Sequence, residues 1–215
     1  FAPPKKSEKE IDPARKREAF YHEVLELQDT FTVLEECRMP TIAAIQGGCI
    51  GGAIDMASAC DMRYCSEDAF FKIAEVDIGI AADVGTLQRL PSLIPLAVLR
   101  ELAYTGRKCD SAEAKSLGLV NEVYSSVEDM MEEVQKLAQT IASKSPLVTR
   151  VIKKQINYAR DNSVRDSLEY HAMWNASLIS NKDTETAITA FMNKSEGEFD
   201  DLEELKSFWE KEGLI

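Results

Sequence analysis

The sequence has few of the residues on which several common chemistries depend. Only two histidines occur among 215 residues, His22 and His171, and they lie far apart in the chain. A zinc site or a Ser-His-Asp triad therefore has little support, and we expect no bound metal. The five cysteines are an odd count without C-x-x-C spacing. They indicate reduced, mostly buried thiols in a reducing compartment, not a disulfide framework.

Long apolar runs and excess positive charge are also missing. No stretch of eighteen apolar residues occurs, so we expect no membrane span. The 25 Lys and Arg against 37 Asp and Glu give a net charge of −12, which argues against a nucleic-acid partner because phosphate binding needs a basic face. The same charge repels small anions, so local donors must hold any anionic ligand.

The chain has enough apolar residues, 45% of the total, to bury one core of good size. Its first residues, FAPPKKSEKEIDPARKR, are polar and contain prolines, and we expect further residues to precede them. Its last residues, KEGLI, are not the S-K-L peroxisomal address.

Apolar periodicity and Gly or Pro punctuation predict an α/β protein. Strands are expected over 41–47, 62–66, 69–73 and 119–125. Helices are expected over 14–37, 53–59, 84–90, 95–106, 110–118, 127–143, 145–161, 163–179 and 184–192, with an acidic tail that could form a last helix over 196–213. Because the final third is all helical, we divide the chain into a core over 1–143 and a helical region over 144–215. The helices of that region must pack on each other or on a partner chain.

A glycine cluster between a predicted strand and a predicted helix is the first candidate site. Gly48, Gly51 and Gly52 let the backbone approach a ligand closely, and the first N–H groups of a helix stabilise negative charge. The alternative is a plain tight turn. Because the G-K-[ST] and G-x-G-x-x-G patterns are absent, a nucleoside triphosphate is disfavoured.

Three acids near this cluster are the candidate proton carriers. Asp55 lies in the first turn of the predicted helix, where a favourable dipole contact is the simpler explanation. Glu75 and Asp83 lie eight residues apart in the apolar stretch EVDIGIAAD. Carboxylates beside apolar walls suit proton transfer near neutral pH, although Asp83 could equally be a helix N-cap. We expect Asp77 to be structural or solvent-facing and Arg89 to be a surface or packing residue.

These pieces together resemble a known family. PTIAAIQGGCIGGAIDMASACDMRYCSEDAFFKIAEVDIGIAADVGTLQRLP resembles the core signature of the enoyl-CoA hydratase/isomerase (crotonase) superfamily, and GRKCDSAEAKSLGLVNEVY and ASKSPLVTRVIKKQIN continue the match. The resemblance implies a crotonase-type ββα spiral with a C-terminal helical trimerisation region. It also implies an acyl-CoA thioester substrate, no separate cofactor because coenzyme A is part of the substrate, a homotrimer or homohexamer, and a place in the peroxisome or mitochondrial matrix.

The resemblance also implies roles for the acids. Asp83 would take the α-proton of the acyl chain, Glu75 would deliver a distal proton, and Asp55 would orient or polarise the centre. Asp55 stands where hydratases carry Glu. This favours the branch that shifts the double bonds of 3,5-dienoyl-CoA to 2,4-dienoyl-CoA in fatty acid β-oxidation.

The remaining implied roles concern binding. Gly52 would supply an oxyanion-hole N–H, Gly48 and Gly51 would line the substrate site, and Lys194 would reach coenzyme A phosphates in a neighbouring subunit. The family's A-G-x-D-like loop, which supplies the second oxyanion N–H, does not occur in these 215 residues. The alternatives are an enoyl-CoA hydratase, a Δ3,Δ2-enoyl-CoA isomerase, or a non-catalytic family member.

Overall fold

Two small three-stranded sheets form the centre of the computed structural model, which describes residues 11–179 and 181–205. One sheet is parallel throughout, and in the other the last two strands run antiparallel. In sheet order, the first contains β1 (Ile42–Ile45), β3 (Met62–Ser66) and β6 (Glu122–Tyr124), and the second contains β2 (Gly48–Ile50), β4 (Phe70–Lys72) and β5 (Cys109–Asp110). Consecutive strands go to different sheets, β1 then β2 and β3 then β4. This is the repeated ββα turn of a spiral, so the expected α/β class is confirmed.

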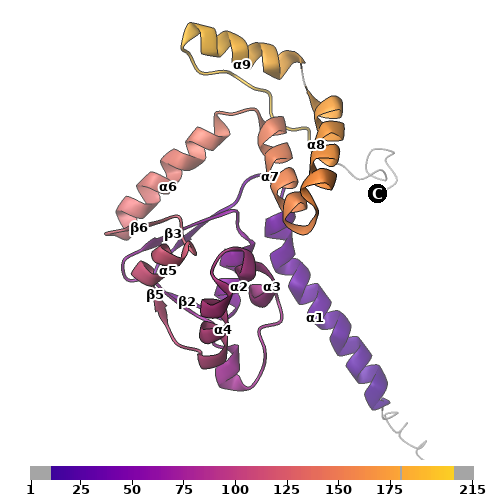
Figure 1. Cartoon of the computed structure of the whole chain (residues 1–215), viewed down its shortest axis with the longest axis vertical. Helices are drawn as coiled ribbons and strands as arrows, with labels where there is room; N and C mark the ends of the chain where they lie inside the picture. Colours follow the sequence, from indigo (N-terminus) through magenta and orange to yellow (C-terminus); the bar gives the residue numbers. More distant parts are fainter. Residues whose placement is uncertain (1–10, 180, 206–215) are drawn as a thin grey trace, which may run out of the picture.

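The helices surround this centre unevenly (Figure 1). They are α1 (Pro13–Glu36), α2 (Gly52–Ala59), α3 (Thr86–Arg89), α4 (Leu96–Thr105), α5 (Ser111–Leu117), α6 (Val127–Ala142), α7 (Pro146–Asp161), α8 (Val164–Leu178) and α9 (Asn181–Asn193), with short 3-10 helices η1 (Glu75–Ile78) and η2 (Leu90–Ser92). α6 packs on the first sheet, α2 to α5 gather about the second, and α1 extends away from both. Within the described residues, no helix combines the length and apolar character needed to cross a membrane.

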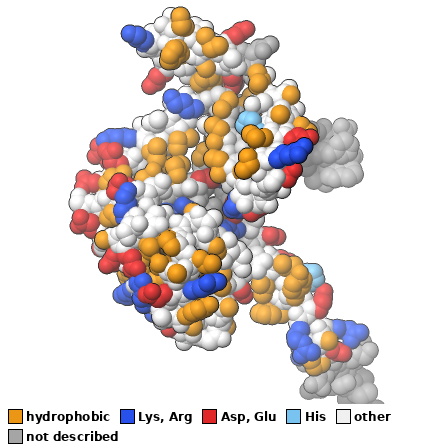
Figure 2. Space-filling model, viewed as in Figure 1, with side chains coloured by type: hydrophobic (Ala, Val, Ile, Leu, Met, Phe, Trp, Pro, Cys, Tyr) orange, Lys and Arg blue, Asp and Glu red, His pale blue; other side chains and the backbone are white. Residues whose placement is uncertain are grey.

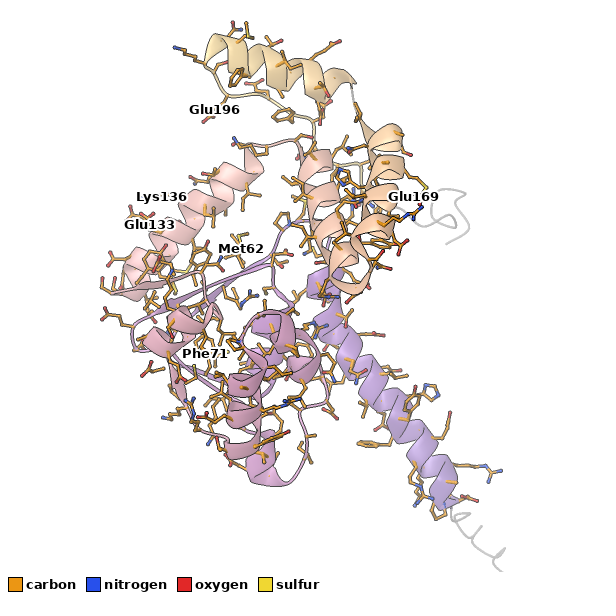
Figure 3. All side chains as sticks on the ribbon, viewed as in Figure 1. Met62, Phe71, Glu133, Lys136, Glu169 and Glu196 are labelled. Carbon is orange, nitrogen blue, oxygen red and sulfur yellow. The ribbon has the colours of Figure 1, made fainter. Side chains whose placement is uncertain are left out.

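The core lies where the inward residues of four strands meet the short helices. Cys49, Cys65, Phe71 and Cys109 are the buried apolar residues of β2 to β5, and none is more than 3% exposed. Three of the four are cysteines, whose small side chains let the strands and the short helices approach each other closely. Phe71 lies inside the body beside α2 and α5 (Figure 3), and burying such a side chain contributes roughly 1.5–3 kcal/mol.

The C-terminal helices attach to this body through α7. The buried Lys153 of α7 donates to the carbonyl oxygens of Leu34 and Met39 at 2.9 and 3.2 Å and pairs with Asp61 at 2.8 Å. α8 has no buried residue and packs on α7, where the rings of Tyr158 and Tyr170 stack with centroids 4.0 Å apart. The division at residue 143 stays a prediction.

Several predicted elements are wrong in detail. The stretch expected as a glycine loop contains strand β2, because pairing with β4 satisfies its backbone and overrides the low strand propensity of glycine. The helix expected over 84–90 is only the four-residue α3, and Pro91 lies in η2, where a first-turn proline is tolerated. Residues 194–205 contain no helix, and the rest of the expected last helix falls outside the described residues.

Candidate active site

The turn between β2 and α2 is built around Gly51. Its φ of 55° and ψ of −124° favour glycine, and its N–H donates to the Lys72 carbonyl at 3.0 Å. A Cβ here would lie 3.0 Å from Oε1 of Glu75. Gly52, the first residue of α2, is exposed. Its N–H therefore belongs to the group that has no partner inside the helix.

Gly48 lies in β2 and not in this turn, so its predicted loop position is wrong. A Cβ at Gly48 would lie 3.0 Å from the Phe70 ring. The close approach that this glycine permits is therefore to Phe70, and its part in substrate binding stays a prediction.

Asp55 is completely buried in the first turn of α2. Its Oδ1 accepts a hydrogen bond from the backbone N–H of Thr86 at 2.6 Å, so it ties α2 to the start of α3. Burial first, and then the nearby charge of Asp55, raise the pKa of the Cys49 thiol to about 12.

Glu75 begins η1 and places its carboxylate over the Gly51 turn. It also lines a cavity of about 530 Å³. The other lining residues are mostly apolar: Ile73, Val76, Gly79, Ile80, Ala81, Ala82, Leu87, Leu99, Arg100, Ala103 and Tyr104. Such a wall suits a hydrocarbon chain.

Asp83 lies in the loop between η1 and α3 and is exposed. Its backbone carbonyl accepts from Nε2 of Gln28 at 2.6 Å. The alternative of a side-chain N-cap at Asp83 is excluded, because the N-cap of α3 is Gly85, without a side-chain bond. Asp55 instead takes the N–H of Thr86, so the side chain of Asp83 is not used in capping.

Three oxygen atoms of this region are buried without a hydrogen-bond partner: Oδ2 of Asp55, Oε2 of Glu75 and Oγ1 of Thr86. Leaving a buried polar group unpaired typically costs about 1–3 kcal/mol, so such atoms concentrate where function requires them. The ion pairs of the described residues include none of Asp55, Glu75 and Asp83. The carboxylates are therefore not neutralised by lysine or arginine.

The predicted residues are only partly brought together. Gly51, Glu75 and Asp55 converge at the start of α2, and Asp83 is linked to them through Thr86. Asp83, however, lines a second cavity of about 530 Å³ with residues of α1, α3 and α7. Lys194 follows α9, at the opposite end of the molecule from α2 (Figure 1).

Two neighbouring charges were also assigned from the sequence. Asp77 is half-exposed and pairs with Lys72 at 2.8 Å, in line with a structural role. Arg89 was expected to be a surface or packing residue; of these two the surface position is excluded, because its side chain is 12% exposed and its Nε lies 2.7 Å from Oε2 of Glu35.

Sequence reasoning missed the residues of α1 that face this loop. Gln28, Thr32 and Glu35 follow an i, i+4, i+7 spacing, which places polar groups on one face of a helix. That spacing could have indicated a polar contact. Within residues 11–179 and 181–205, no group of three or more His, Cys, Asp or Glu could hold a metal ion.

The fold and this arrangement define a class of protein. The enoyl-CoA hydratase/isomerase family model matches residues 10–202, so the chain belongs to that family. An enoyl-CoA hydratase structure from Bacillus anthracis superposes with a TM-score of 0.79 at 31% identity, covering 88% of this chain and 71% of that one. The expected crotonase-type spiral is confirmed.

Named relatives within this family are similar to most of this chain. A mitochondrial Δ(3,5)-Δ(2,4)-dienoyl-CoA isomerase of Rattus norvegicus is 48% identical over 79% of this chain and 52% of its own length. A peroxisomal Δ(3,5)-Δ(2,4)-dienoyl-CoA isomerase of Arabidopsis thaliana is 44% identical over 87% of this chain and 68% of its own length. The chain thus spans about half the length of the rat relative.

Proposed function

We propose that this chain carries the proton-transfer centre of an isomerase that converts 3,5-dienoyl-CoA to 2,4-dienoyl-CoA in fatty acid β-oxidation. The carrying observation is the set of three carboxylates, Asp55 and Glu75 at the start of α2 and Asp83 on the loop before α3. Among the described ion pairs none of them pairs with lysine or arginine, and Asp55 and Glu75 each have a buried oxygen without a partner. Relatives that share 44–48% of their aligned residues with this chain bear that name.

The chemistry requires a proton to leave near the thioester and another to arrive farther along the chain. A thioester acidifies its α-carbon if the enolate oxygen is stabilised, and the Gly52 N–H at the start of α2 suits that task. One such donor is typically worth about 3–4 kcal/mol. Asp83 takes the α-proton, the electron pair spreads over the conjugated system, and Glu75 protonates the distal carbon. No oxidant or reductant is needed.

The apolar cavity beside Glu75 supports its distal role, because a hydrocarbon chain could lie against those walls. The bond from Thr86 N–H to Asp55 supports an orienting role for Asp55, since it fixes the residues that follow Asp83. Asp55 thus acts on the position of Asp83 through the backbone.

Family membership suggests which substrate the chain binds and how copies of the chain assemble. Its members act on acyl-CoA thioesters, so coenzyme A enters as part of the substrate and we expect no separate cofactor. Apolar side chains are exposed on the C-terminal helices (Figure 2), among them Leu168 at 66% and Phe191 at 81%. Such faces support a homotrimer or homohexamer, in which Lys194 would reach the coenzyme A of a neighbour. The relatives' names support the mitochondrial matrix or the peroxisome.

Hydration is the second candidate, because the Bacillus anthracis structure is named a hydratase. The assay is spectrophotometric: a 3,5-dienoyl-CoA is given to the full-length protein and the conjugated 2,4 product is followed. We expect Asp83→Asn to lower turnover by roughly 100- to 10,000-fold, the usual contribution of a general base. Unchanged turnover in that variant contradicts the proposal. Hydration of a 2-enoyl-CoA without dienoyl isomerisation supports the hydratase, and binding without any turnover supports a non-catalytic member.

A further inference from the structure

Arg89 makes contacts that a packing residue does not need. Its Nε donates to Oε2 of Glu35 at 2.7 Å, its Nη2 to Oγ1 of Thr32 at 3.2 Å, and its Nη1 to the carbonyl of Val84 at 3.4 Å. The guanidinium also lies against Gly85, where a Cβ would be only 1.7 Å from Nη1. Arg89 therefore occupies the space directly behind the two residues that follow Asp83.

Glu35 holds this guanidinium in place. Its other oxygen, Oε1, pairs with Nη1 of Arg160 on α7 at 2.5 Å, and its side chain is 15% exposed. Burial alone raises the pKa of Glu35, but hydrogen bonds from Arg89 and Arg160 and their charges outweigh burial and hold that pKa below its ordinary value. Glu35 is thus ionised at neutral pH and joins α1 to α3 and α7, which meet in Figure 1.

The loop that carries Asp83 is fixed at three successive points. Gln28 donates to the carbonyl of Asp83 at 2.6 Å, Arg89 donates to the carbonyl of Val84, and the N–H of Thr86 donates to Asp55. The backbone is therefore held while the side chain of Asp83 stays exposed.

The charges around Asp83 come from every element packed against its loop. α1 contributes Glu35 and Glu36, α3 contributes Arg89, and α7 contributes Arg160 and Asp161, all lining the same cavity. Asp55 of α2 lies behind Thr86. A guanidinium that pairs with a carboxylate makes that carboxylate a weaker base. Glu35 engages both arginines, so neither pairs with Asp83 among the described ion pairs.

We infer that Glu35 and Arg89 are positioning residues for the isomerisation. Together they hold the Asp83 loop in place, and Glu35 keeps Arg89 and Arg160 from pairing with Asp83. This inference rests on the proposed function, because it takes Asp83 as the base. It adds two residues that act through Asp83 and do not touch the substrate.

The test compares Glu35→Gln with a matched ion-pair variant, Lys153→Met, in the full-length protein. Lys153 pairs with Asp61 and also joins α7 to the end of α1, and its hydrogen bonds and ion pair among the described residues do not reach the Asp83 loop. We expect Glu35→Gln to lower kcat by roughly 10- to 100-fold with little change in KM, since a displacement of about 1 Å can cost 100-fold. Lys153→Met should lower the melting temperature. Its kcat should stay within about twofold of the wild-type value, because distant sites that share no partner act almost independently.

The pH dependence of kcat is a second measurement, and a residue that only stabilises the fold would leave it unchanged. Without the charge of Glu35, Arg89 and Arg160 favour the ionised form of Asp83, so the acid limb of kcat should move to lower pH. Arg89→Lys keeps the charge and should recover part of the loss that Arg89→Met shows. An unshifted acid limb together with an unchanged kcat in Glu35→Gln overturns the inference.

Hydrogen exchange separates this inference from the proposed function. The peptide covering residues 83–86 should exchange faster in Glu35→Gln than in Lys153→Met, whatever the substrate of the enzyme. The wild-type protein could fail to isomerise a dienoyl-CoA while this peptide still loses protection in Glu35→Gln. In that case the proposed function is wrong, but Glu35 does hold the Asp83 loop. Equal exchange in both variants means that Glu35 does not hold the loop, and the inference fails.

Discussion

Gly51→Ala is the substitution for which the structure makes the most specific prediction, because it affects both the backbone and the space beside Glu75. The positive φ of Gly51 falls where side chains are rarely tolerated, so the change should cost about 1–3 kcal/mol of folding free energy. The new Cβ would also lie 3.0 Å from Oε1 of Glu75, so the carboxylate must retreat by a few tenths of an ångström. Because about 1 Å of misplacement can cost 100-fold, we expect kcat to fall by roughly three- to tenfold.

The matched control is Gly118→Ala at the end of α5. Gly118 also has a positive φ, of 81°, but its Cβ would make only an ordinary contact with the Leu93 carbonyl at 3.6 Å. Both variants should lose melting temperature, by roughly 2–4 °C for each kcal/mol, and only Gly51→Ala should lose kcat for dienoyl-CoA. Equal kcat values in the two variants refute the placement of the Glu75 carboxylate over this turn.

Two further predictions concern thiols and acid stability. The pKa of about 12 for the buried Cys49 predicts that a thiol reagent at pH 8 modifies the exposed Cys37 first and Cys49 only after unfolding, as mass spectrometry of the labelled peptides would show. The pKa of Glu35 lies below its ordinary 4.5, so its ion pairs stabilise the fold above about that pH and the stabilisation is lost as pH falls through the folded pKa. Acid denaturation of Glu35→Gln should therefore show a weaker pH dependence below pH 4.5 than the wild type shows; parallel curves contradict the pairing.

Local signals predicted the helices well because their determinants lie within a few residues of each other. The helix expected over 110–118 begins after Asp110, whose side chain accepts from the Glu113 N–H at 2.8 Å. Gly118 ends that helix in the left-handed conformation and Pro146 begins α7, so both ends lie within about a residue of the expected ranges 110–118 and 145–161. The glycine turn and the first-turn position of Asp55 were likewise readable from the sequence.

The remaining features depend on contacts between distant segments. Asp55 meets Thr86 across 31 residues, and Glu35 meets Arg89 across 54. Spacing within one element can show that a helix face is polar, but it does not identify the partner in a distant segment. The sequence therefore left the surface and packing alternatives open for Arg89, and it left open an N-cap role for Asp83 where Asp55 takes the N–H of Thr86. Strand β2 exists because β4 pairs with it, which the glycine-rich sequence did not indicate.

The direction of proton transfer is the central claim, and isotope exchange in heavy water tests it most directly. A 3,5-dienoyl-CoA is incubated in D2O with the wild-type protein, Glu75→Gln or Asp83→Asn, and the position of deuterium is read by NMR. The account predicts that Glu75→Gln exchanges the α-protons while forming little conjugated product, and that Asp83→Asn does neither. An Asp83→Asn variant that exchanges α-protons at the wild-type rate would contradict the assignment of Asp83 as the base.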